Sequence, residues 1–324
     1  MLYEWLRPQA KKIRQRIKNK KWPGSYLYEL NGHLGANELA REIIIQLLCT
    51  NEENPGCKSC EACSAYLADS NPDVLEVKRE EGAKSIKIDD LREAITKSEK
   101  TPVLSQHQVL YIENCEKMTV QCANALLKTL EEPKRSLFIV LHTESLNQLM
   151  ATIKSRCQID TIMVDSDMLD SEIDKMINRN KKYGFLKYTH RNKPLELEKV
   201  MQEEKTYELY KIIVESMSTS IWQPLMLSER MATHGLDETI ECYLNCIGAI
   251  WADSTNLKCK HKELYDALKK EFRQIEKSTV SLLNLEKIQK ELLEVKNITE
   301  GGIVYTGNYL RESLMIKIWQ IIQA

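Results

Sequence analysis

The chain has 324 residues, with 46 Lys or Arg against 47 Asp or Glu, a hydrophobic fraction of 43% and a formal net charge of −1. This composition excludes wholesale disorder and a collagen-like fibre, and the near-zero charge argues against a protein that grips nucleic acid alone. The length predicts two or three domains, and the absence of a long apolar run or a secretory leader predicts a cytoplasmic protein without a membrane span.

The first 22 residues are strongly basic, with eight Lys or Arg and a single Glu. Leu6, Ile13 and Ile17 recur at helical spacing, so we expect a short helix with one basic face. Two interpretations remain open for that face: a solvated helix surface, or a contact to phosphate or nucleic acid.

Strand and helix patterns then alternate. A strand-like run at Tyr26–Leu30 is followed by a glycine turn at Asn31–Gly35 and a helix over Asn37–Leu48, which is the context of a phosphate-binding loop. This alternation predicts an α/β domain with a doubly wound, mostly parallel sheet. The other expected elements are strands at 73–77, 108–112, 137–141 and 158–164, and helices from Asp89 or Asp90 to 98, over 124–131, and over about nine residues capped by Ser145.

Strand signals nearly vanish after residue 165. We expect a small helical unit over 165–205 and a domain of long helices over 206–324. The last helix, Asn308–Gln323, carries an apolar stripe that is either internal core or an assembly contact. The other long helices are expected at Leu264–Ile275 and Leu283–Leu293, and the stripe consists of Leu310, Leu314, Ile318 and Ile321.

Four of the ten cysteines, Cys49, Cys57, Cys60 and Cys63, lie within fifteen residues. Two overlapping Cys-x-x-Cys pairs favour a structural zinc site with four thiolate ligands. Free cysteines are the alternative, but clustered exposed thiols oxidise readily. A catalytic zinc would need an open coordination position, which four cysteines leave no room for. Cys242 and Cys246 stand four apart on an expected helix, and we interpret them as buried small hydrophobes.

The glycine turn lacks the residues that bind a nucleotide. A working phosphate loop ends in Gly-Lys-Ser or Gly-Lys-Thr, but the loop here is Gly32-His-Leu-Gly35, with Ala36 and Asn37 at the lysine and hydroxyl positions. A register shifted by two residues puts Glu38 at the lysine position instead. The strand at 108–112 is followed by Glu113-Asn114, where an ATPase carries two acidic residues. We therefore expect no tight ATP binding and no catalysis by this chain alone.

Three segments resemble the clamp-loader AAA+ family of bacteria. They are Ala123–Pro133 (ANALLKTLEEP), Ser155-Arg156-Cys157 and the cysteine insertion, and the opening Trp5–Pro8 is similar as well. The resemblance covers about residues 1–163, and the spacer between Cys49 and Cys57 is shorter than in the family.

The resemblance implies an AAA+ module over 1–164, a helical lid over 165–205 and a collar domain over 206–324. It implies a ring of five subunits with gamma/tau motor subunits and a delta subunit, acting on a sliding clamp and primer–template DNA. A catalytically silent member of such a ring supplies an arginine to a neighbouring ATPase site, and here Arg156 matches that arginine.

Several alternatives remain open beside this interpretation. Arg156 could instead form an internal ion pair, and Lys128, Glu131 and Glu132 either form a solvated helix end or contact an adjacent subunit. For the chain as a whole, the competing functions are a zinc-dependent DNA-binding protein and a weakly active AAA+ ATPase.

Overall fold

The computed structural model describes residues 2–80, 83, 85–178, 186–190, 193–218, 223–255, 282–300 and 307–323. The chain forms two compact units, Met1–Leu169 and Asp170–Ala324. None of the described helices is long and apolar enough to cross a membrane.

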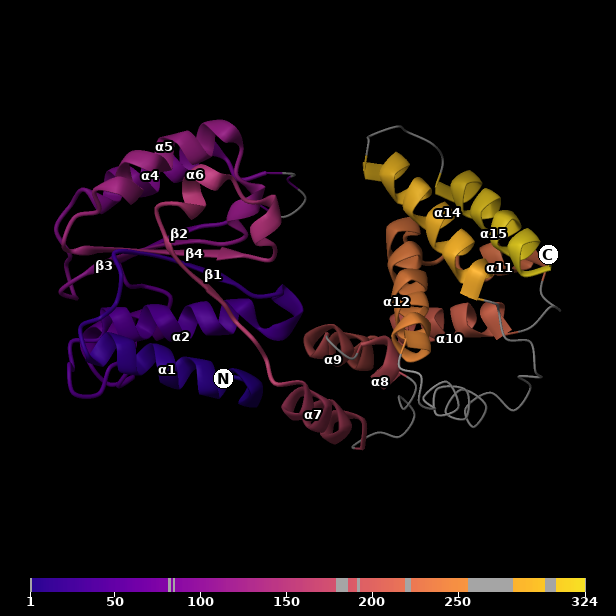
Figure 1. Cartoon of the computed structure of the whole chain (residues 1–324), viewed down its shortest axis with the longest axis horizontal. Coiled ribbons are helices and arrows are strands. Elements are labelled where there is room, and N and C mark those ends of the chain that lie inside the picture. Colours follow the sequence, from indigo (N-terminus) through magenta and orange to yellow (C-terminus); the bar gives the residue numbers. More distant parts are fainter. Residues whose placement is uncertain are drawn as a thin grey trace. The chain divides into compact units, whose positions relative to one another are not determined.

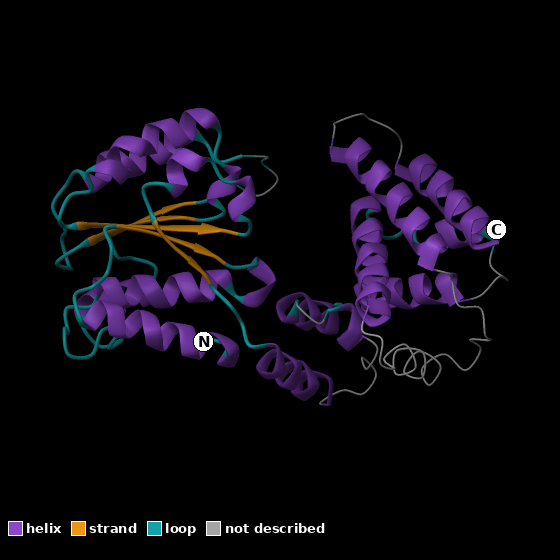
Figure 2. Ribbon diagram, viewed as in Figure 1, coloured by secondary structure: helices purple, strands orange, loops and turns teal. Residues whose placement is uncertain are grey.

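The first unit is built on a five-stranded sheet with the order β2-β3-β4-β1-β5, in which all neighbouring strands are parallel. Helices α1 (Arg7–Lys18) and α2 (Ala36–Leu48) cover one face, while α4 (Ile88–Ser98), α5 (Val120–Glu131) and α6 (Ala151–Lys154) cover the other (Figures 1 and 2). The predicted α/β fold is therefore confirmed. The strands are β1 (Ser25–Glu29), β2 (Val74–Val77), β3 (Gln108–Ile112), β4 (Leu137–Thr143) and β5 (Gln158–Thr161), and α3 (Glu61–Leu67) follows the cysteine loop.

The central strands are buried on both faces, which explains their unbroken apolar sequences. All five residues of β3 are buried, and Leu27, Leu110 and Ile139 from three strands share one core with α4 and α5. The helices on both faces thus enclose the central strands.

Two expected helices differ in the structure. No nine-residue helix follows Ser145: a 3-10 turn, η4 (Leu146–Gln148), is separated from α6 by extended backbone at Leu149 and Met150. Leu149 is buried, and the break in the helix lets its side chain reach the core. Helix α5 begins at Val120 rather than Asn124, because the Thr119 hydroxyl caps it by accepting a bond from the Cys122 amide.

The expected caps Asp89 and Asp90 lie inside the first turn of α4, and Lys87 is its N-cap. At that place the two carboxylates still face the positive end of the helix dipole.

The second unit is helical in its described parts, as expected for this half of the chain. Leu314 and Ile318 from the final apolar stripe are fully buried, so these two residues are internal core. The predicted helix at 264–275, and Cys259, lie outside the described residues. The helices are α8 (Leu186–Thr189), α9 (Pro194–Gln202), α10 (Glu204–Ser218), α11 (Pro224–Arg230), α12 (Leu236–Thr255), α14 (Leu282–Glu300) and α15 (Gly307–Gln323), while α7 (Ser166–Asn178) spans the boundary between the units.

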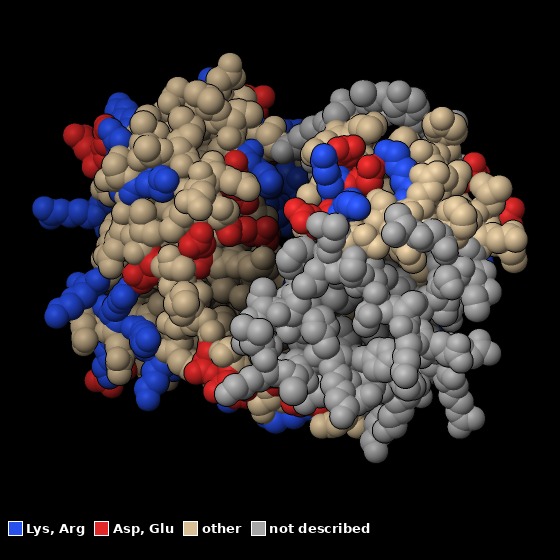
Figure 3. All heavy atoms as spheres, turned by 45° about the vertical axis from the view of Figure 1, so that its right-hand side comes forward, with Lys and Arg blue, Asp and Glu red and all other residues tan. Residues whose placement is uncertain are grey.

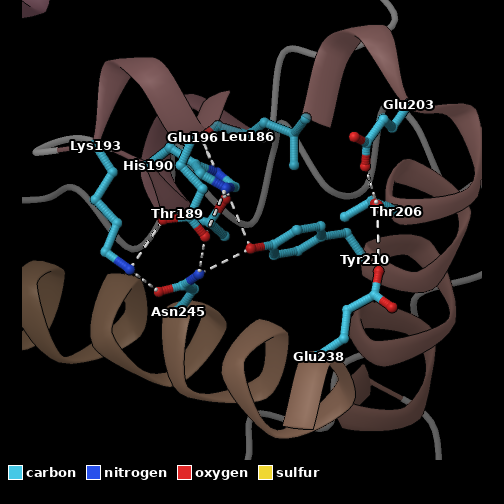
Figure 4. A network of polar contacts seen from close by, with 10 residues as sticks. All are labelled: Leu186, Thr189, His190, Lys193, Glu196, Glu203, Thr206, Tyr210, Glu238 and Asn245. Carbon is cyan, nitrogen blue, oxygen red and sulfur yellow. Dashed lines mark hydrogen bonds and ion pairs between the residues drawn. The ribbon is translucent and has the colours of Figure 1, made fainter. Parts of the chain in front are cut away.

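A polar network joins the segment around α8 and α9 to α10 and α12 (Figure 4). The Tyr210 hydroxyl accepts a bond from Asn245 Nδ2 at 2.9 Å and lies 3.1 Å from Nε2 of the buried His190. Asn245 also accepts from Lys193 Nζ at 3.0 Å and donates to Glu196 at 2.9 Å. Because buried polar groups are costly to leave unpaired, the network holds α8 and α9 in place against α10 and α12. Burial raises the pKa of Tyr210 well above its ordinary value, so the phenol stays protonated.

We predict that Tyr210→Phe destabilises the second unit by about 1–3 kcal/mol, because it leaves the buried His190 and the half-buried Asn245 each short of one hydrogen bond. Amide hydrogen exchange of the full chain should show faster exchange in α10. Tyr309→Phe, at a side chain that is 63% exposed on α15, is the matched control and should change nothing. Equal protection of α10 in both variants would show that the network is not stabilising.

Candidate functional site

The four clustered cysteines come together between α2 and α3. Their sulfur atoms all lie within 4.8 Å of one another. Cys49 is the C-terminal cap of α2, Cys60 is the N-cap of α3, and Cys63 lies in its first turn. Gly56 has a φ of +78°, and a Cβ there would lie 3.0 Å from the Gln46 side chain, so the loop requires glycine at this turn.

The cluster fits a tetrahedral metal. Zinc–sulfur bonds of about 2.3 Å put the sulfurs of a tetrahedral site about 3.8 Å apart, which this spacing allows with small side-chain shifts. The backbone amides of Cys57 and Cys60 donate to Cys49 Sγ at 3.4 Å and Cys57 Sγ at 3.3 Å. Hydrogen bonding, chiefly from Ser59, lowers the pKa of the Cys57 thiol to about 6, while burial raises that of Cys63. These four cysteines can therefore hold a metal ion with soft ligands.

The glycine turn after β1 is occupied by the chain's own groups. Gly32 N–H donates to Glu144 Oε1 at 2.9 Å, and His33 N–H donates to Asn31 Oδ1 at 2.9 Å. A carboxylate oxygen thus accepts from an amide that a phosphate loop would offer to its ligand. Glu144 was missed at the sequence level, because it lies 112 residues from Gly32 along the chain.

The N-terminal 3-10 turn, η1 (Glu4–Leu6), packs against the same loop. The Trp5 indole N–H donates to the Leu34 carbonyl at 2.8 Å. Gly35 is left-handed at a φ of +92°, and a Cβ there would lie 2.9 Å from Tyr3 and 3.0 Å from Leu6. The loop is therefore held from one side by aromatic and aliphatic side chains and from another by a carboxylate.

Asn114 stands directly beyond β3, at the same edge of the sheet. Its backbone is left-handed and its N–H donates to His142 Nδ1 at 3.4 Å. His142 Nε2 lies 2.8 Å from the Leu30 carbonyl, so Nε2 carries the proton and Nδ1 accepts. Burial lowers the pKa of His142, which keeps the ring neutral in this bridge between the ends of β1, β3 and β4. The sequence did not identify His142, because the apolar run of β4 gives no sign that a residue near its end forms hydrogen bonds with residues that follow other strands.

Arg156 lies at the opposite edge of the sheet, two residues before β5. Its Nε and Nη2 donate to Glu131 Oε1 at 2.8 and 2.5 Å. Its Nη1 donates to the Thr152 carbonyl at 2.9 Å and to Ser155 Oγ at 3.3 Å. The ion pair left open by the sequence thus exists, with Glu131 at the end of α5 as the partner, while the Arg156 side chain keeps 30% of its surface exposed. Glu131 therefore has a partner within the chain, whereas Glu132 is the C-cap of the helix, with a φ of −130° and a ψ of 65°.

The basic arm forms α1 as expected, and half of its basic side chains are paired. Arg14 lies 3.2 Å from Glu42, Lys20 lies 2.9 Å from Glu52, and Arg16 binds Asp160, which also accepts from the Tyr26 hydroxyl. Arg7 pairs with Glu4 at 2.6 Å. Among the described pairings, these tie the arm to its own unit and reduce the charge that it offers to a partner.

Comparison by family model and by sequence finds subunits of DNA polymerase III. Residues 6–165 match the family model described as DNA polymerase III, delta subunit. The chain is 30% identical over 171 residues to the DNA polymerase III subunit delta' of Haemophilus influenzae, covering 53% of this chain and 52% of that protein. It is 36% identical over 134 residues to the subunit of the same name from Pseudomonas aeruginosa, covering 41% of each. The match thus spans about half the length of these curated relatives.

A solved structure of a DNA polymerase III gamma subunit-related protein from Thermotoga maritima aligns over 97% of this chain and 99% of its own length. The TM-score of that alignment is 0.46 and the sequence identity is 19%.

We predict one zinc ion per chain, bound by Cys49, Cys57, Cys60 and Cys63. Cys60→Ser should lose the metal and raise hydrogen exchange over residues 49–67, because metal binding contributes directly to local folding. Cys157→Ser changes a half-buried cysteine outside the cluster and should keep the metal. Elemental analysis of protein purified without chelator checks both variants, and metal-free wild-type protein with its thiols reduced would contradict the prediction.

Proposed function

From the match of residues 6–165 to the family model described as DNA polymerase III, delta subunit, we propose that the chain is a delta-prime subunit of a clamp loader. In this role it is the silent member of a five-subunit ring with gamma/tau motor subunits and a delta subunit. The ring loads the sliding clamp onto primer–template DNA. Residues 165–205 serve as the lid and 206–324 as the collar that joins the subunits. Arg156 completes the ATPase site of a neighbour.

The observation that carries the proposal is the position of Arg156 relative to the chain's own loop. β1 and β5 are parallel, in register from Tyr26↔Gln158 to Glu29↔Thr161. Arg156 lies before the first paired residue of β5, and Gly32 lies after the last paired residue of β1. Along the strand direction the two residues are therefore separated by at least the length of β5, roughly 10 Å. Arg156 cannot serve a nucleotide on its own loop. A partly exposed guanidinium at that edge supports the proposal that Arg156 meets a phosphate on another subunit.

The proposal that this chain is not catalytic is supported by the opposite edge of the sheet. The loop has no lysine to reach the β- and γ-phosphates, and Asn114 has no carboxylate with which to polarise an attacking water. Glu144 accepts from the Gly32 amide and would repel a phosphate there. These features favour a silent subunit over a weakly active ATPase.

The competing function as a DNA-binding protein finds less support. The net charge is −1, and the basic arm is half neutralised by its own unit. On the face drawn in Figure 3, acidic and basic side chains of the described residues lie interspersed. DNA contact through the assembled ring fits this surface better than independent binding.

We predict that the isolated chain neither hydrolyses ATP nor binds it tightly. Calorimetric titration with Mg·ATP should give a dissociation constant far weaker than about 1 μM. Glu144→Ala frees the Gly32 amide but supplies no lysine, so it should not restore tight binding. A sub-micromolar constant for the wild-type chain would contradict this account of the loop.

We predict that Arg156→Ala assembles normally but lowers DNA- and clamp-stimulated ATP hydrolysis and clamp loading. Arginine fingers raise turnover by about 10³–10⁵ at a single site, but the ring has several sites, so total turnover should fall less. Arg156→Lys should be nearly as poor, because a point charge lacks the two parallel donors. Arg135→Ala, an exposed arginine just before β4, is the control and should retain activity. Full clamp loading by an Arg156→Ala ring of verified stoichiometry would remove the finger from the mechanism.

A further inference from the structure

The contacts of Arg156 fix the orientation of its guanidinium. The Nε–H and one N–H of Nη2 both point to the same oxygen, Glu131 Oε1. These two donors form one edge of the planar group, so a single carboxylate oxygen held at that edge sets the plane. On the other side, Nη1 donates to the Thr152 carbonyl at 2.9 Å, which stops rotation about the end of the side chain.

Two donors remain beyond the contacts with Glu131 and Thr152. A guanidinium has five N–H groups, and the pair with Glu131 and the bond to Thr152 use three of them. The other two belong to Nη1 and Nη2 at the tip of the group. One of them meets Ser155 Oγ only at 3.3 Å, which is a long contact for a hydrogen bond. Parallel N–H groups at the tip are the arrangement that binds two phosphate oxygens.

We propose that Glu131 is a positioning residue for Arg156: it aims the tip of the guanidinium outward for a phosphate on a neighbouring subunit. This inference rests on the proposed function of Arg156. The carboxylate occupies the edge of the guanidinium that a phosphate does not need and leaves the tip available. Both side chains are partly exposed, at 30% for Arg156 and 50% for Glu131, so the pair orients the group without burying it.

The position of Glu131 in α5 explains why it takes this role and its neighbour does not. Glu131 is the last residue of the helix, on the turn that faces α6 and Arg156. Glu132 follows with a φ of −130° and a ψ of 65°, is exposed and makes no described contact with Arg156. The two adjacent glutamates carry equal charge, but only Glu131 contacts the guanidinium, so Glu132 serves as the control.

The test compares Glu131→Ala, Glu131→Gln and Glu132→Ala in the complete assembled ring, with DNA- and clamp-stimulated ATP hydrolysis as the readout. Glu131→Ala should lower kcat by about three- to tenfold, the scale of one lost bond to a charged group diluted over several sites. The KM for ATP and the stoichiometry of the ring should not change. Glu131→Gln should recover much of the loss, because its amide oxygen can still accept from Nε and Nη2. Glu132→Ala should match the wild type.

A double variant separates positioning from an independent role. Glu131→Ala together with Arg156→Ala should be no slower than Arg156→Ala alone, because the glutamate acts only through the arginine. A further fall in the double variant would overturn the inference. So would wild-type turnover in Glu131→Ala, a rise in turnover that marks Glu131 as a restraint, or loss of assembly in both Glu131 variants.

The outcome for Arg156 is measured in the same experiment. If Arg156→Ala lowers turnover but Glu131→Ala does not, the proposed function stands and the positioning role falls. If Arg156→Ala has no effect, the arginine-finger role of Arg156 is wrong, and so is the positioning role of Glu131 that depends on it.

Discussion

The parallel pairing of β1 with β4 on one side and β5 on the other is the constraint on which the rest of the first unit depends. In a parallel sheet, all carboxyl ends of the strands meet at one edge and all amino ends at the other. The register therefore gathers the glycine turn, Asn114 and Glu144 at one edge. It also puts Arg156 and the end of α5 at the opposite edge, next to the start of β5. The loop that could contact the chain's own ligand and the arginine that could contact a neighbour therefore lie at opposite edges of the sheet.

The carboxyl edge is held together by contacts within the chain. Glu144 bonds the Gly32 amide, the neutral ring of His142 bridges Asn114 and Leu30, and Trp5 bonds the Leu34 carbonyl. Each contact satisfies a backbone group that would otherwise need water or a ligand. These contacts supply acceptors or donors for the backbone groups of Gly32, Asn114, Leu30 and Leu34 without a nucleotide, which fits the silent role proposed above.

The sequence predicted the parts that local patterns determine and missed those that distant partners determine. β3 was predicted to the residue, because its apolar run has clear ends at His107 and Glu113. The cysteine cluster was predicted from spacing alone and the sulfurs do converge. The helix after Ser145 was wrong, because the need to bury Leu149 outweighs local helix propensity.

Two contacts at the carboxyl edge join residues that lie 112 positions apart in the sequence: Gly32 with Glu144, and Leu30 with His142. No local pattern predicts such contacts. The network around Tyr210 was also invisible, since its members lie on segments that meet only after folding. For Arg156 the sequence left a finger and an ion pair as alternatives. The structure contains the ion pair, and its geometry is compatible with both.

The most direct test of the central claim, that Arg156 acts on a neighbour, is a structure of the assembled ring with a non-hydrolysable ATP analogue in the motor subunits. The account predicts that Nη1 and Nη2 of Arg156 lie about 2.7–2.9 Å from oxygens of the γ-phosphate in the adjacent subunit, with Nε still beside Glu131. An Arg156 side chain that faces solvent or its own subunit, with the neighbouring γ-phosphate beyond its reach, would contradict the account.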